Sequence, residues 1–73
     1  MTAPFILYRS RHNATGEKTK ILYICRNTGR ARRLLRVNPE DVFFSGTSEE
    51  CEREAAYIYT PRGYFFAGFQ LIQ

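Results

Sequence analysis

Five arginines stand within eleven residues in the first half of this chain: Arg26, Arg30, Arg32, Arg33 and Arg36. A guanidinium donates paired hydrogen bonds to a phosphate or a carboxylate, and it stays charged at every physiological pH. Such a cluster indicates binding to a polyanion or to an acidic protein surface. The alternative is a solvated basic face that offsets acidic residues elsewhere in the domain.

The charged residues are divided unevenly along the chain. Residues 1–37 carry nine Lys and Arg and one acid, a net +8, and residues 38–73 carry two Arg and six acids, a net −4; together they make the +4 of the whole chain. We predict that the basic residues of the first half bind the partner. They are Arg9, Arg11, Lys18, Lys20, Arg26, Arg30, Arg32, Arg33 and Arg36.

Residue types for other chemistry are sparse. The chain has one histidine, His12, and two cysteines, Cys25 and Cys51, with no CxxC or HxxxH spacing. Catalysis needs a nucleophile, a base and a stabilising group in one cleft, and a metal site needs several ligands at short spacings. We therefore predict no catalytic residue, no metal site, no cofactor and no enzyme activity.

The length predicts one domain that spans residues 1–73. An apolar fraction of 44% with five Tyr and six Phe is enough for one core. No apolar run reaches the roughly 20 residues of a membrane span, and residues 1–8 lack a signal-peptide pattern. We therefore expect a cytoplasmic protein in which both cysteines are reduced and partly buried, although a secreted domain would pair them.

The elements that must position the arginines begin with a hairpin. Residues 4–10 and 20–26 are β-favourable runs, and residues 12–16 between them are polar and turn-rich. Residues 30–37 are ambiguous. The preceding turn and the terminal Val37 favour a third strand, with Arg30 and Arg32 on one face and Arg33 on the other. Helix propensity favours a short helix capped near Thr28.

The second half predicts two helices and a strand. Asn38-Pro39-Glu40-Asp41 is a helix-start pattern for a short helix that Ser45-Gly46 ends. Thr47 and Glu50 predict a capping box for a helix over 48–59, whose buried face is Cys51, Ala55 and Ile58. The glutamates of this helix have three possible roles. They can form a solvated face, mimic the charge of a nucleic acid, or form ion pairs with the basic segment of the same domain.

Residues 64–72 predict a strand with apolar residues on both faces, which favours a central place in the sheet. Phe65 and Phe69 share one face, and Tyr64 and Phe66 share the other. Core packing is the favoured role for these aromatics, and Tyr64 and Phe66 are the best candidates for an exposed stacking contact.

The expected fold class is α+β. A small, mainly antiparallel sheet of three or four strands is packed by one α-helix, in the order β-β-β, short helix, α, β. This plan, with the small size and the missing catalytic centre, resembles the very small proteins that lytic phages make to bind host RNA polymerase. The resemblance implies a phage protein in the host cytoplasm that regulates transcription. It would inhibit initiation by competing with σ, or modulate termination (antitermination).

Host RNA polymerase is thus the predicted partner, without a membrane role. The strongly basic first half departs from the more acidic members of that group, which leaves weak non-specific contact with nucleic acid open. A three-stranded sheet followed by a helix also resembles the arm-binding domains of phage integrases, which implies a small basic DNA- or RNA-binding module. A structural or assembly accessory protein is the third alternative.

Overall fold

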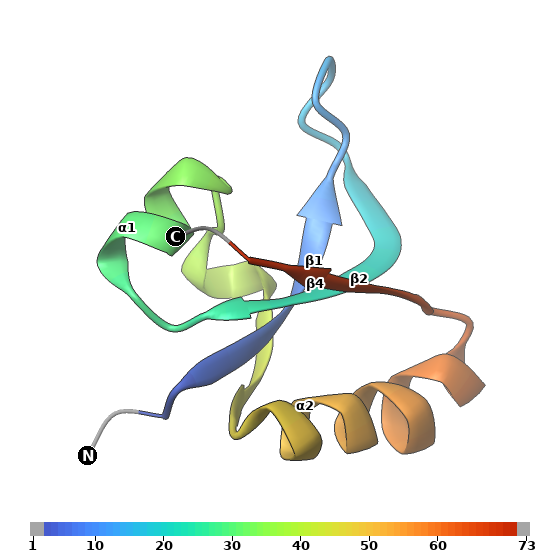
Figure 1. The fold of residues 1–73 in the computed structure, drawn as a ribbon. Helices are drawn as coiled ribbons and strands as arrows, with labels where there is room; N and C mark the ends of the chain where they lie inside the picture. The colour runs from blue at the N-terminus through green and yellow to red at the C-terminus, as the bar shows by residue number, and fades with distance from the viewer. Residues whose placement is uncertain (1–2, 72–73) are drawn as a thin grey trace.

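Four strands form one mixed sheet in the order β3-β1-β2-β4 (Figure 1). The structure is a computed structural model that describes residues 3–71. The strands are β1 (Phe5–Arg11), β2 (Lys18–Arg26), β3 (Val42–Gly46) and β4 (Phe65–Gln70). β1 pairs antiparallel with both β2 and β3, whereas β4 pairs parallel with β2. The predicted hairpin and the predicted α+β class, with a small sheet and one main helix, are confirmed.

Helical segments cover the two faces of this sheet (Figure 1). α1 (Gly29–Leu34) and the 3-10 turn η1 (Pro39–Asp41) connect β2 to β3. α2 (Ser48–Glu54) continues without a break into the π-helical turn η2 (Ala55–Tyr59) and the 3-10 turn η3 (Thr60–Arg62), which leads to β4. Leu7, Leu22 and Ile24 are fully buried on the α2 face. Ile6, Tyr8 and Cys25 are buried on the α1 face.

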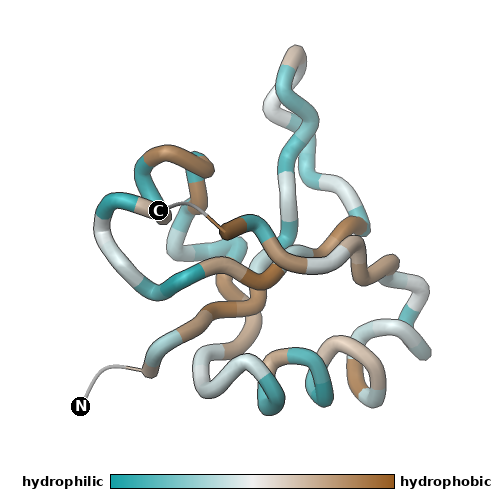
Figure 2. The backbone as a smooth tube through the Cα atoms, viewed as in Figure 1, coloured by the Kyte–Doolittle hydropathy of each residue, from teal (hydrophilic) through white to brown (hydrophobic). Residues whose placement is uncertain are grey.

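The alternation of side chains along the hairpin produces these two cores. Leu7 pairs with Ile24, and the next pair in the ladder, Ile6 with Cys25, points to the opposite face. Hydrophobic residues run along the crossing strands, and hydrophilic residues lie at the hairpin tip (Figure 2). Cys25 and Cys51 are free and fully buried, and the sheet separates them because Cys51 belongs to the α2-side core.

The favoured strand over residues 30–37 is wrong, and the helical alternative holds there. The Thr28 hydroxyl accepts a hydrogen bond from the Ala31 backbone N–H at 3.1 Å, which caps the first turn of α1. Ala31 is 1% exposed, so this one small residue provides the contact with the sheet. The third strand is instead β3, because the predicted short helix shrinks to the turn η1 and Val42 then pairs with Tyr8.

The predicted helix over 48–59 is confirmed with its capping box. The Thr47 N–H donates to Glu50 Oε1 at 2.9 Å, and the Glu50 N–H donates to Thr47 Oγ1 at 3.2 Å. Cys51 and Ala55 are buried as expected, but Ile58 is 39% exposed. The prediction for Ile58 fails because the wider π-helical turn shifts the register after Ala55, and Tyr59 contacts the core in its place.

The last strand lies at an edge of the sheet, so its predicted central position is wrong. β1 occupies the centre with β2, because it pairs on both sides. Ala67 is an extra residue in the ladder between Phe66 and Gly68, and Gly68 has φ +113°. This bulge places Phe66 and Phe69 on one face, where their ring centroids lie 6.4 Å apart. Strict alternation along the strand predicts opposite faces for these two residues. Residue 72 lies outside the described residues.

No helix within residues 3–71 has the length and the apolar composition needed to cross a membrane.

One prediction tests the two-faced core with a matched pair of substitutions in β2. Ile24→Val should lower the free energy of unfolding by about 0.5–1.5 kcal/mol, because the removed methylene leaves a gap in a fully buried cluster. Ile21→Val, the same change at a side chain that is 37% exposed, should cost clearly less. Urea unfolding measures both. Equal losses would contradict the assignment of Ile24 to the core.

Candidate partner-binding site

The nine basic residues predicted to bind a partner fall into three places. Arg9 and Arg11 lie on β1 and are half-buried. Lys18, Lys20 and Arg26 lie along β2 and are exposed. Arg30, Arg33 and Arg36 are exposed on and just after α1, and Arg32 is half-buried there. The structure therefore gathers only the last four into one local group.

Arg9 and Arg11 are engaged inside the domain by a buried acid. Arg9 Nη2 donates to Asp41 Oδ1 at 2.8 Å, and Arg11 Nε donates to Asp41 Oδ2 at 2.7 Å. Arg11 also donates to Glu40 through Nη2. The Asp41 side chain is 1% exposed, and Asn38 Nδ2 adds a third donor at 3.4 Å. These two arginines therefore hold the chain before β3 against β1, which is a structural role.

The electrostatics of Asp41 follow from this arrangement. Burial by itself raises the pKa of the carboxyl, but hydrogen bonds from Arg11, Arg9 and Asn38 outweigh burial and hold the pKa at about 2, below the ordinary 3.8. Sequence reasoning assigned Asp41 to a helix start and missed its role. The available signal was Arg9 and Arg11 on the inward face of β1, because a charge that faces a core needs a partner.

α1 presents the remaining arginines outward. Its only buried residue is Ala31. The three ion pairs within residues 3–71 all involve Arg9 or Arg11, so no described carboxylate neutralises the α1 arginines. Leu34 lies among them and is 56% exposed.

Arg36 closes α1 in an unusual backbone conformation. Its φ is +55°, and it is the one non-glycine residue with positive φ in the described chain. The Arg36 N–H donates to Arg33 O at 3.2 Å and the Val37 N–H donates to Arg32 O at 2.8 Å. This pattern is a Schellman ending, in which the position of Arg36 is usually glycine because a side chain there costs about 1 kcal/mol or more.

A groove of about 890 Å³ opens on the α1 side of the sheet, between the hairpin and the end of α1. Its lining includes Tyr8, Tyr23, Arg36, Asn38 and Gln70. Tyr8 and Tyr23 stack with their ring centroids 6.1 Å apart. Burial, followed by the proximity of Cys25 and Tyr23, raises the pKa of Tyr8, so its phenol stays protonated at neutral pH.

The thiols are equally unsuited to react. Burial raises the pKa of Cys25 and of Cys51 to about 11. Both are therefore neutral and shielded at physiological pH. Within the described residues, no three His, Cys, Asp or Glu side chains are grouped so that they could hold a metal ion.

The predicted stacking residues are not the exposed aromatics. Tyr64 and Phe66 are half-buried and pack against the α2-side core. Phe65 and Tyr57 are 66% and 74% exposed, respectively. The basic residues of β2 are exposed, and two of them lie near aromatic rings. Lys20 Nζ lies 5.8 Å from the Tyr64 ring centroid, and the guanidinium carbon of Arg26 lies 5.9 Å from the Phe5 ring centroid.

No protein-family model, curated protein or solved structure matches this chain.

A pH prediction follows from Asp41. A carboxyl whose pKa is about 2 in the folded chain and 3.8 when unfolded stabilises the fold by about 2–3 kcal/mol at neutral pH. Because the folded pKa is the lower one, this contribution is complete above about pH 5 and is lost as pH falls through 3.8 toward 2. Asp41→Asn should destabilise the protein at pH 7 and flatten its acid-side stability profile. Glu52→Gln, a change at an exposed carboxyl, should leave that profile intact.

A second prediction uses the backbone of Arg36. Arg36→Gly should raise the free energy of unfolding by about 0.5–1 kcal/mol, because glycine adopts positive φ without strain. Arg33→Gly removes the same charge from within α1 and should lower it by about 1 kcal/mol. Thermal and urea unfolding of both variants give the comparison. Destabilisation by Arg36→Gly would show that the side chain of Arg36 stabilises the fold.

Proposed function

We propose that this protein is a non-enzymatic regulator that binds an acidic surface of a larger protein through α1 and its C-terminal turn. One observation carries the proposal. Four arginines are gathered on a six-residue helix and its ending without a described acidic partner, and Arg36 among them occupies a backbone position that favours glycine. A side chain kept at a cost in stability at a surface points to a role in binding.

The surface composition favours a protein partner over a nucleic acid. Leu34 is 56% exposed between the arginines, so the surface offers apolar area together with guanidinium groups. Arginine and apolar area are typical of protein interfaces. The module resembling an integrase arm-binding domain would read DNA with a three-stranded sheet. Here helices cover both faces of a four-stranded sheet, which weakens that alternative.

Host RNA polymerase is the partner that we propose, in line with the resemblance to small phage regulators. Binding would occlude a surface that σ needs, or shift polymerase between conformations. Inhibition would then be stoichiometric with polymerase and reversible on dilution, because no covalent step is involved.

The test compares two variants with equal loss of charge. Arg30→Ala with Arg33→Ala should weaken binding of a bacterial RNA polymerase holoenzyme about tenfold or more, since each arginine of a buried contact is worth 1 kcal/mol or more. Arg53→Ala with Arg62→Ala, on the α2 side of the molecule, should change it little. The readouts are fluorescence anisotropy of labelled protein and promoter-dependent initiation in a purified system.

Binding to naked DNA separates the protein partner from the nucleic-acid alternative. Three exposed arginines predict a log–log salt slope of about −3 and weak affinity without sequence preference. Tight binding to one DNA sequence, with no binding to polymerase in the same buffer, would defeat the proposal. Equal effects of the two double variants would remove α1 as the binding surface.

A further inference from the structure

β4 ends the sheet with one side unpaired. In the order β3-β1-β2-β4 it pairs only with β2, so the backbone groups on its other side have no strand partner among residues 3–71. An exposed edge is a template on which another extended chain can add. The start of β4 lies away from α1, whereas its C-terminal end approaches α1, where Gln70 lines the same groove as Arg36 (Figure 1).

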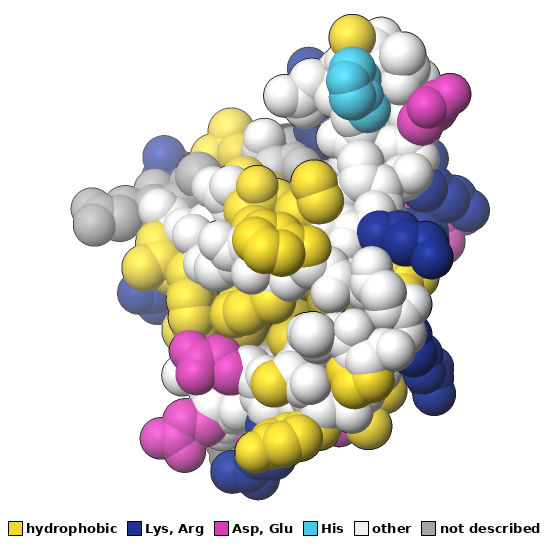
Figure 3. All heavy atoms as spheres, turned by 90° about the vertical axis from the view of Figure 1, so that its right-hand side faces the viewer, with side chains coloured by type: hydrophobic (Ala, Val, Ile, Leu, Met, Phe, Trp, Pro, Cys, Tyr) yellow, Lys and Arg dark blue, Asp and Glu magenta, His cyan; other side chains and the backbone are white. Residues whose placement is uncertain are grey.

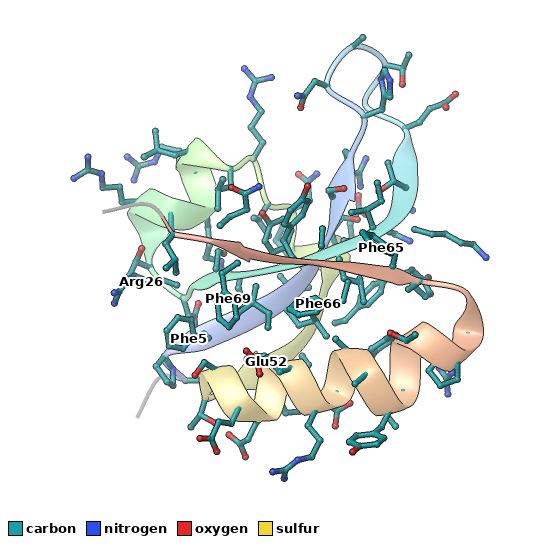
Figure 4. The ribbon with its side chains drawn as sticks, turned by 45° about the vertical axis from the view of Figure 1, so that its right-hand side comes forward. Phe5, Arg26, Glu52, Phe65, Phe66 and Phe69 are labelled. Carbon is teal, nitrogen blue, oxygen red and sulfur yellow. The ribbon has the colours of Figure 1, made fainter. Side chains whose placement is uncertain are left out.

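Apolar side chains are exposed on both faces of this edge. Phe69 is 38% exposed on the α2 face (Figure 4). Its ring centroid lies 6.3 Å from that of Phe5 and 6.4 Å from that of Phe66. Phe65 is 66% exposed on the opposite face beside Ile21, its partner in the ladder, which is 37% exposed. A partner laid on one face would leave the other aromatic in water. An added strand places side chains over both.

Hydrophobic side chains reach the surface in the middle of the face where β4 begins, with Lys and Arg side chains along the right of this area and Asp or Glu side chains at its lower left (Figure 3). The apolar and basic groups around the free edge indicate the chemistry of a segment that could bind there.

The charges at the two ends of β4 are both positive. Lys20 precedes Ile21, the ladder partner of Phe65, and so lies at the start of β4. Arg26 follows Cys25, the partner of Gln70, and its guanidinium carbon lies 5.9 Å from the Phe5 ring centroid. A second copy paired antiparallel at this edge would place Arg26 of one copy and Lys20 of the other at the same end of the joined sheet, two strands apart, so it would add positive charge at each end and supply no carboxylate there.

Acidic groups at the two ends of the occupant would complement these cations. Glu52 on α2 faces the aromatic cluster beneath β4 (Figure 4). The negative charge of Glu52 would repel an acidic residue in the middle of the bound segment. Acidic residues are therefore favoured only at the ends of that segment. The bulge at Ala67 and the positive φ of Gly68 twist the edge, which limits pairing to a short segment and opposes open-ended stacking.

We infer that the free edge of β4 binds a short extended segment of another protein, with alternate apolar residues and an acidic residue at each end. The segment adds as a fifth strand, and its alternate side chains point to opposite faces. Its apolar residues cover Phe65 and Ile21 on one face, and its acidic end residues with the residues between them lie on the α2 face beside Phe69, Lys20 and Arg26. This inference does not depend on the identity of the partner proposed above.

The test uses a defined peptide, acetylated and amidated Glu-Val-Thr-Val-Thr-Val-Glu, with isotope-labelled protein. We expect it to shift the backbone amide resonances of residues 65–70 in a saturable way. The matched control, Lys-Val-Thr-Val-Thr-Val-Lys, should bind about tenfold more weakly because both of its ends meet like charge. Arg26→Glu should weaken binding of the acid-ended peptide about tenfold. Arg33→Glu, the same change on α1, should leave it within about threefold.

A second pair of variants tests the apolar contact without touching the core. Phe65→Ser should weaken binding of the acid-ended peptide, whereas Tyr57→Ser removes a comparably exposed aromatic from η2 and should not. The proposal is overturned by absent shifts in residues 65–70 at millimolar peptide, by shifts at β3 instead, or by equal binding of the two peptides. Shifts of the β4 amides that depend on protein concentration alone would identify a second copy as the occupant and overturn it as well.

Discussion

Asp41 is the buried charge on which the arrangement of the sheet depends. Its carboxylate accepts hydrogen bonds from Arg9 and Arg11, so the end of β1 is tied to the turn that begins β3. Because these charges are desolvated, removing one of Asp41, Arg9 or Arg11 would leave its partner with an uncompensated charge and would destabilise the fold. The constraint places β3 on one side of β1, and β2 already occupies the other side. β4 pairs with the free side of β2 and is therefore an edge strand.

The same contact divides the basic residues by role. Arg9 and Arg11 are neutralised within the domain, so the described basic residues of the first half that form no ion pair lie along β2 and on α1 with its C-terminal turn. The sheet separates the α1 arginines from the glutamates of α2, because the two helices cover opposite faces. The acidic helix therefore does not hold the basic segment, which was one of its predicted roles. The charge asymmetry between the halves of the sequence becomes an asymmetry between two layers.

Local signals predicted the parts of the fold that local interactions determine. The hairpin and the capping box of Thr47 and Glu50 depend on neighbours in sequence, and both are present. Long-range contacts decide the rest. Residues 30–37 have two acceptable local conformations, and the cap at Thr28 with the burial of Ala31 selects the helix. The edge position of β4 and the bulge that realigns Phe69 depend on pairing with β2, which no pattern within residues 64–72 encodes.

The candidate site also has a part that the sequence predicted and a part that depends on long-range contacts. Composition alone located the arginine cluster, because charge type needs no fold to be counted. It could not tell that Arg9 faces a core while Arg33 faces water, since that difference arises from strand alternation and from a partner 32 residues away. Nor could it find the positive φ of Arg36, where the local geometry favours glycine and the sequence has arginine. Such a conflict between local preference and residue type is expected where a surface is selected for binding as well as for folding. In a chain with a small core, the strain at the turn of Arg36 reduces stability, and the exposed apolar area at the edge of β4 adds nothing to the core. Their presence in one small domain agrees with the two contact surfaces proposed above, one on α1 and one at the edge of the sheet.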